Sequence, residues 1–156
     1  MDVFRTDRIR NVVLLGHGGA GKTTLAEAMA YLAGMTNRLG RVEDGNTVSD
    51  YDKEEIKRQF SISTSLIPLE YEGDDGPMKI NILDTPGHQD FSEDTYRTLM
   101  AADSAVMVID GSKGVEAQTR KLFKVCVMRH IPIFTFINKM DRDANDTFDL
   151  LDEIEK

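Results

Sequence analysis

The sequence is poor in several residue types, and each shortage narrows the class of protein. Its 156 residues include a single cysteine, Cys126, so no disulfide can form within the chain, as is usual in reducing compartments. Apolar runs such as Val12 to Leu15 are far shorter than the roughly 20 residues that span a bilayer, and no targeting segment is visible. We therefore expect a cytoplasmic protein with no membrane partner.

Positive charge is also scarce. Nineteen Lys and Arg stand against 27 Asp and Glu, which gives a net charge of -8. Such an acidic chain is a poor electrostatic binder of nucleic acid, so we expect no direct nucleic-acid binding from these residues alone. With 40% apolar and 29% charged residues, the composition is that of an ordinary globular domain, and we expect a monomer.

Short apolar segments alternate with helical patterns along the chain. Strands are expected at 10–15, 62–71, 78–83, 104–109 and 131–137, and helices at 25–34, at 115–129 and from Asp146 onward. The turn residues Gly73 to Pro77 predict a hairpin between the second and third strands. This order predicts an α/β fold of the phosphate-loop NTPase type, a doubly wound, mostly parallel sheet with one antiparallel edge strand.

The three helices each show a predicted buried face, and one long segment shows none. The buried positions are expected to be Leu25, Ala28, Met29 and Leu32, then Leu122, Phe123, Cys126 and Val127, then Phe148, Leu151 and Ile154. Residues 36–60 are polar and weakly periodic, which predicts a mobile functional loop. No closing strand follows the last helix, so we expect residues 1–156 to form one nucleotide-binding domain that is incomplete at its C-terminal end.

A glycine-rich motif follows the first strand and precedes the first helix. Gly16-His17-Gly18-Gly19-Ala20-Gly21-Lys22-Thr23 matches GxxxxGK(S/T), in which consecutive backbone N–H groups curl around phosphate oxygens at a helix N-terminus. Lys22 is expected to neutralise the β- and γ-phosphates, and Thr23 to hold Mg²⁺. Thr24 is expected to reach the α-phosphate. The motif predicts a nucleoside triphosphate site without selecting the base.

Two further motifs stand at strand ends. In Asp84-Thr85-Pro86-Gly87, the Asp84 carboxylate can hold Mg²⁺ through water, and the Gly87 N–H can bind the γ-phosphate. In Asn138-Lys139-Met140-Asp141, Asp141 can accept the two N–H groups that guanine offers and adenine lacks. Asn138 would bridge the base and the phosphate loop, and the Lys139 stem would cover the sugar and ring. Together the motifs favour a GTPase.

The segments GHGGAGKTT, DTPGHQDF and INKMD, with RVEDGNTVSDYDKEEIKRQFSIS, carry a family resemblance. Over essentially its whole length the chain resembles the start of the GTP-binding domain of translational GTPases, in particular elongation factor G and elongation factor G-like proteins. The resemblance implies Mg²⁺-dependent GTP hydrolysis to GDP as a switch acting on the ribosome. The sequence shows no candidate arginine finger, so we expect the isolated chain to be slow or inactive, and the resemblance implies that the ribosome is the activating partner.

The same resemblance assigns roles that spacing alone does not. His88, directly after DTPG, would position the attacking water. Residues 36–60 would be the first switch, and Ser61 would stand where the family has the threonine that closes on Mg²⁺, with Thr64 as the alternative. Gly19 replaces an Asp that many members carry, which removes support for a monovalent cation site. The family's last guanine-contacting loop would lie beyond residue 156.

Other functions and other residues receive plainer interpretations. The alternatives to a GTPase are a nucleotide-binding fragment without hydrolytic activity and an ATP-using phosphotransferase on the same loop. Cys126 and Met140 are expected to pack in the core. The side chain of His17 is expected to be incidental, because the loop binds phosphate through its backbone, and His130 to end a helix.

Overall fold

The computed structural model describes residues 3–49, 53, 57, 63–87 and 93–156. After a short 3-10 turn (Thr6–Arg8), the elements run in the following order: β1 Ile9–Leu15, α1 Lys22–Leu32, β2 Ser65–Gly73, β3 Gly76–Asp84, α3 Glu93–Ala101, β4 Ser104–Asp110, α4 Ala117–Met128, β5 Ile133–Asn138 and α5 Thr147–Glu155. Every strand and helix expected from the sequence is present, with ends shifted by a few residues.

The strands form one sheet in the order β2-β3-β1-β4-β5. β1 runs parallel to both β3 and β4, and β4 runs parallel to β5. β2 pairs antiparallel with β3 through a turn at Asp74 and Asp75, and it carries Pro68, a residue tolerated mainly in edge strands. The predicted doubly wound sheet with one antiparallel edge strand is confirmed.

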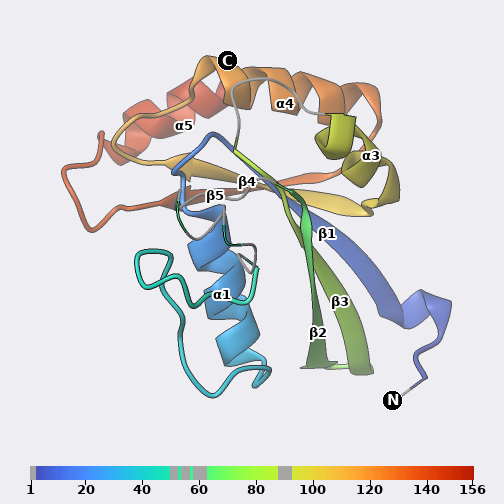
Figure 1. Cartoon of the computed structure of the whole chain (residues 1–156). Coiled ribbons are helices and arrows are strands. Elements are labelled where there is room, and N and C mark those ends of the chain that lie inside the picture. The colour runs from blue at the N-terminus through green and yellow to red at the C-terminus, as the bar shows by residue number, and fades with distance from the viewer. Residues whose placement is uncertain (1–2, 50–52, 54–56, 58–62, 88–92) are drawn as a thin grey trace.

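Helices cover both faces of the sheet. Figure 1 shows α1 on one face and α3, α4 and α5 on the other. Alternate residues of β1 point to opposite faces, so Leu14 joins the core under α1 while Val13 and Leu15 join the core under α3 and α4. Cys126 is fully buried in the second core, and burial raises the pKa of its thiol to about 11, in agreement with the predicted inert packing role.

The expected helix faces were partly wrong. In α1 the buried residues include Ala26, Glu27 and Ala30, whereas Leu32 is 83% exposed. In α4, Phe123 and Val127 are exposed, and the buried face includes Thr119, Leu122, Val125 and Cys126. In α5, Leu150 is buried, whereas Phe148 and Leu151 are exposed. The expected faces followed the large apolar residues, but in α1 the small residues Ala26 and Ala30 are the ones that pack against the sheet.

The helix boundaries follow local chemistry. Asp146 caps α5 by accepting a hydrogen bond from the Phe148 N–H at 2.9 Å, as predicted. His130 lies just after α4 in a left-handed conformation, with its N–H donating to the Val127 carbonyl, which also matches the prediction that it ends a helix. Within the described residues, no helix is long and apolar enough to cross a membrane.

The described part of the long polar segment, for which a mobile loop is expected, contains turns and buried polar residues. Turn hydrogen bonds connect Arg41 to Asp44 and Val42 to Gly45, and Thr47 and Ser49 are buried. Backbone N–H groups in this segment donate to polar side chains, so the turns leave no apolar pattern in the sequence.

Candidate functional site

The phosphate loop joins β1 to α1 and depends on glycine at three positions. Gly16, Gly19 and Gly21 all have positive φ, at 148°, 80° and 99°. A Cβ at Gly21 would collide with the side-chain nitrogen of Asn138, so glycine is required there for close approach as well as for conformation. The predicted strand–loop–helix context of the motif is therefore present.

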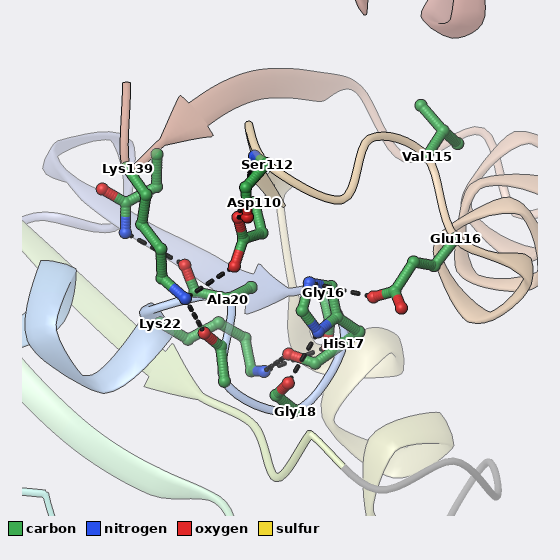
Figure 2. Close-up of polar contacts among 12 residues, drawn as sticks. Gly16, His17, Gly18, Ala20, Lys22, Asp110, Ser112, Val115, Glu116 and Lys139 are labelled. Carbon is green, nitrogen blue, oxygen red and sulfur yellow. Dashed lines mark hydrogen bonds and ion pairs between the residues drawn. The ribbon is translucent and has the colours of Figure 1, made fainter. Parts of the chain in front are cut away.

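Lys22 is buried at the start of α1 and points into the loop. Its Nζ donates to the carbonyls of Gly16 at 3.0 Å and His17 at 2.9 Å (Figure 2). Burial lowers the pKa of Lys22 from 10.5 to about 8, and the nearby Asp84 carboxylate opposes this shift. The ammonium thus lies inside the curl of the loop, where phosphate oxygens can replace its carbonyl partners.

Thr23 and Asp84 come together from α1 and the end of β3. The Thr23 hydroxyl donates to Asp84 Oδ2 at 2.8 Å, and Asp84 is completely buried. A hydroxyl beside a buried carboxylate at a phosphate site is the set of hard oxygen donors that Mg²⁺ prefers, so these two residues fit the ion that the motifs imply. Thr24, the next residue along α1, is exposed.

The DTPG segment packs directly against the phosphate loop. A Cβ on Gly87 would lie 2.5 Å from the Gly18 Cα and 2.8 Å from Lys22 Nζ, so a larger residue would push the two segments apart. Thr85 is buried and its hydroxyl donates to the Leu14 carbonyl at 2.5 Å, which ties this segment to β1. Gly87, the last residue of this segment, therefore lies beside the ammonium of Lys22 and the phosphate loop.

Asn138 and Lys139 tie the end of β5 to the phosphate loop. Asn138 donates to the Ala20 carbonyl at 3.0 Å, the bridge to the loop that the sequence predicted. Lys139, in a left-handed conformation, donates to the Gly19 carbonyl and to Asp110 Oδ2, each at 2.6 Å (Figure 2). The segment Asn138 to Asp141, called the guanine motif below after its predicted role, is thus joined to the phosphate loop by hydrogen bonds.

Asp110 is a site residue that sequence reasoning missed. It ends β4, is 1% exposed, and accepts hydrogen bonds from Lys139 and from the N–H and hydroxyl of Ser112. Burial would raise the pKa of its carboxyl, but the hydrogen bonds from Lys139 and Ser112 outweigh it and lower the pKa to about 2. Its position at a strand end beside the other motifs was the available signal.

The remaining residues of the guanine motif are more open. Asp141 is exposed, which leaves its carboxylate accessible to a base. Met140 is 44% exposed, so the expectation that it packs in the core was wrong. The tight turn that follows β5, in which Arg142 N–H donates to the Lys139 carbonyl, turns the Met140 side chain out of the core.

His17 also departs from expectation, because its side chain is buried and bonded. Its Nδ1 lies 2.6 Å from the Gly18 carbonyl, and its Nε2 lies 3.0 Å from a carboxylate oxygen of Glu116, just before α4. The ring thus packs the phosphate loop against the start of α4, beside a depression of about 530 Å³ that Gly87 also lines. A loop that binds through its backbone still needs side chains to hold that backbone.

A comparison with sequence models of protein families shows which family the chain belongs to. The model described as elongation factor Tu GTP binding domain matches residues 7–156. The chain belongs to this family. Peptide chain release factor 3 proteins of Staphylococcus aureus (strain JH9) and Staphylococcus epidermidis are each 56% identical over 151 residues, covering 94% of this chain and 28% of the relative.

The structural comparison agrees with this membership of the elongation factor Tu GTP-binding family. A solved protein from Thermus thermophilus superimposes with a TM-score of 0.87 at 34% identity, covering 95% of this chain and 22% of that chain. The chain is therefore similar to about a quarter of the length of these larger proteins. The resemblance to translational GTPases is confirmed, and the two relatives given above carry the name peptide chain release factor 3.

Two residues to which the family resemblance gave a role lie outside the described residues, namely Ser61 and His88. Thr64, the alternative to Ser61, is described, and its hydroxyl lies 3.1 Å from that of Thr98 on α3. In this arrangement Thr64 contacts α3, whereas Thr23 lies on α1. The roles of Ser61 and His88 stay predictions.

Proposed function

We propose that this chain is the guanine-nucleotide site of a translation factor that binds GTP and hydrolyses it to GDP and phosphate on the ribosome. The observation that supports this most is the single bonded unit formed by the phosphate loop, Asp84 and the NKMD motif. Membership of the elongation factor Tu GTP-binding family supports the same nucleotide.

The triphosphate would be held by the loop from Gly16 to Thr23. Backbone N–H groups of Gly18, Gly19, Ala20 and Gly21 would bind phosphate oxygens at the N-terminus of α1, where the helix dipole favours anions. Lys22 would exchange its two carbonyl partners for the β- and γ-phosphates. Thr24 would reach the α-phosphate from the first turn of α1.

The base would be selected by the segment after β5. Asp141 would accept both N–H groups of guanine, and adenine would leave this carboxylate without matched donors. The stem of Lys139 would cover the sugar and ring while its ammonium stays on Gly19 and Asp110. Asn138 holds this segment in register with the loop through Ala20.

Hydrolysis would use water in line with the γ-phosphate. His88 would orient that water, since it follows Gly87, which packs against Gly18 and Lys22. Thr23 and Asp84, joined by Ser61, would hold a Mg²⁺ ion, which when bound supplies positive charge to the β- and γ-phosphates. In the full-length factor on ribosomes, unchanged single-turnover hydrolysis in His88→Ala would refute the role of His88.

In this proposal the factor acts in peptide-chain release, whereas the family resemblance pointed to elongation factor G and elongation factor G-like proteins. The support is the 56% identity to proteins named peptide chain release factor 3. On ribosomes stalled at a stop codon, the full-length protein should stimulate release-factor turnover in a GTP-dependent way. On ribosomes awaiting translocation, it should not stimulate translocation. Stimulation of translocation alone would instead support an elongation factor G-like role.

The nucleotide proposal is tested with a fluorescent GDP analogue in Mg²⁺, displaced by unlabelled GDP or by ATP. We expect displacement by GDP and not by ATP. Displacement by both would favour the phosphotransferase alternative and contradict guanine selection by Asp141. Tight GDP binding with no hydrolysis by the full-length factor on ribosomes would favour the non-hydrolysing alternative.

A further inference from the structure

The loop between β4 and α4, residues 111–116, has no role in the proposed nucleotide chemistry and is here called the β4–α4 loop. Backbone hydrogen bonds fix its first half. The Gly114 N–H donates to the Asp110 carbonyl at 2.9 Å, and the Gly111 N–H donates to the Asn138 carbonyl at 2.9 Å. The β4–α4 loop therefore begins as a compact turn that is attached to the end of β4 and to the guanine motif.

The end of the β4–α4 loop reaches the phosphate loop through two side chains. A carboxylate oxygen of Glu116, the last residue before α4, lies 3.0 Å from His17 Nε2, and Figure 2 shows the two side chains facing each other. The other ring nitrogen of His17, Nδ1, lies 2.6 Å from the Gly18 carbonyl. Because His17 is only 5% exposed, its ring has little room to move independently of Glu116. A displacement of Glu116 would thus reach the phosphate loop.

Glu153 on α5 holds the same end of the β4–α4 loop by its backbone. Its Oε2 accepts a hydrogen bond from the Val115 N–H at 2.9 Å, and Val115 directly precedes Glu116. The place from which a side chain starts is set by its own backbone. Glu153 therefore fixes the point from which Glu116 reaches His17, and a helix outside the nucleotide site is connected to the phosphate loop by a continuous series of contacts.

Gly114 gives independent evidence that Glu153 packs closely against the β4–α4 loop. A Cβ at Gly114 would collide with Glu153 Oε2, and the φ of 70° at this residue already favours glycine. Glu153 is also only partly exposed, whereas Asp152 and Glu155 on the same helix are exposed. The contact can thus be broken from the helix or from the loop, and Glu155 offers a matched control.

We propose that Glu153 is a positioning residue that acts on the phosphate loop through Glu116 and His17. With the Glu153 contact in place, the β4–α4 loop keeps Glu116 against the His17 ring, and the ring holds the Gly18 peptide group in the curl of the phosphate loop. Without this contact the phosphate loop loosens and bound nucleotide leaves faster. The series of contacts stands on the structure alone, and its effect on nucleotide rests on the proposed function.

Amide hydrogen exchange of the 156-residue chain without nucleotide tests the contact and its reach separately. The Val115 amide reports the contact with Glu153, and the Ala20 amide, which donates to the His17 carbonyl, reports the phosphate loop. In Glu153→Ala, which keeps a good helix former in α5, exchange should speed up by about tenfold at Val115 and about threefold at Ala20. Unchanged exchange at Val115 would overturn the contact. Faster exchange at Val115 with none at Ala20 would overturn its action on the phosphate loop.

Two further variants separate this contact from a general disturbance of α5. The matched control is Glu155→Ala, the same substitution at an exposed carboxylate of α5, which should leave the Val115 and Ala20 amides at their wild-type exchange rates. Gly114→Ala breaks the contact from the loop side, so it should speed up both amides as Glu153→Ala does. The same increase in Glu155→Ala as in Glu153→Ala would overturn the proposal, and so would wild-type exchange in Gly114→Ala.

The effect on nucleotide is measured by the dissociation of fluorescent GDP. Glu153→Ala should release it about fivefold faster than the wild type, and Glu155→Ala at the wild-type rate. Glu153→Gln keeps a carbonyl oxygen that can accept from Val115, so its rate should lie between those of the wild type and Glu153→Ala. Equal rates in Glu153→Ala and Glu155→Ala would overturn the positioning role. Failure of wild type and control alike to bind GDP would instead refute the proposed function, and exchange at Ala20 would still decide whether Glu153 acts on the phosphate loop.

A double variant shows whether Glu153 acts through Glu116. The Glu116 side chain makes no capping hydrogen bond to α4, so Glu116→Ala removes its contact with His17 without removing a helix cap. Glu116→Ala should also speed up GDP dissociation, and adding Glu153→Ala should give no further increase. Two increases that multiply would show that Glu153 supports the fold by another route, and would overturn the proposal.

Discussion

The phosphate loop and the guanine motif lie at strand ends of the same sheet, but they prepare for a ligand differently. On the phosphate side, the charged groups are buried: Lys22 in the loop and Asp84 at the end of β3 are inside the fold and already bonded. In the guanine motif, Asn138 and Lys139 are bonded to the loop, whereas Asp141, which reads the base, is exposed.

This difference separates affinity from selectivity. The cost of burying Lys22 and Asp84 is met when the chain folds, so phosphates enter a site whose charges are already in place. Asp141 must lose water when the base arrives, and an unmatched base leaves it desolvated without partners. Phosphate contacts should therefore supply most of the binding free energy, and Asp141 most of the discrimination between bases.

The largest loss of GDP affinity is expected when the charge of Lys22 is removed. Lys22→Met keeps the length of the side chain and removes its charge, so we expect GDP affinity to fall by about 100-fold, since a hydrogen bond to a charged group is worth up to about 3 kcal/mol. Fluorescent GDP titration measures this, with Lys124→Met on the exposed face of α4 as the control. A loss under threefold would mean that backbone groups alone carry the phosphate contact.

The second largest effect should come from the base side. Asp141→Asn presents an amide donor to the N–H groups of guanine, so GDP affinity should fall by about 30-fold while ATP affinity stays the same. Competition titrations with both nucleotides measure the ratio. If GDP and ATP affinities fall together, Asp141 supports the fold of the site and does not read the base.

The pH dependence of binding distinguishes the two sides without mutation. The free site has a Lys22 pKa of about 8, so its ammonium is lost as pH rises through 8, whereas bound phosphates require the protonated form. GDP affinity should therefore fall roughly tenfold between pH 7 and pH 9. Titrations across this range should show the slope in the wild type and a flat profile in Lys22→Met, while Asp141→Asn keeps the slope.

The smallest loss of GDP affinity is expected from a change at Asp110, which through Lys139 connects the guanine motif to the phosphate loop. Asp110→Asn removes the charge that holds Lys139 on Gly19, so GDP affinity should fall by about threefold. Because hydrogen bonds keep the Asp110 pKa near 2, this difference from the wild type should be constant from pH 5 to pH 7. A difference that vanishes toward pH 5 would show that Asp110 is not ionised through this range.

The positions of the motifs in the fold were predicted better than the packing of the helices. Glycine, lysine and carboxylate motifs at strand ends have few structural solutions, so the loop, Asp84 and Asn138 were placed correctly from spacing alone. Asp110 and Glu153 were not found, because a single acidic residue in a sequence does not reveal which distant backbone or ammonium group will meet it. His17 was misjudged for the same reason, since Glu116 is about 100 residues away.

Helix faces were predicted least well. Periodicity correctly found α1, α4 and α5, yet the residues of α1 that pack against the sheet include Ala26 and Ala30, while the larger Leu32 points to solvent. Hydrophobicity ranks residues by what they gain on burial, but close packing against a twisted sheet also depends on shape. That information resides in the partner strands and not in the helix.

Pro68 makes the two edges of the sheet unequal in their capacity to pair with a further strand. β2 is an edge strand, and proline has no N–H to donate, so the hydrogen-bond ladder that a further strand would need is interrupted in the middle of that edge. β5, at the opposite edge, has no proline between Ile133 and Asn138. Strand addition, whether by the same polypeptide or by another, is therefore discouraged beside the hairpin and permitted beside β5.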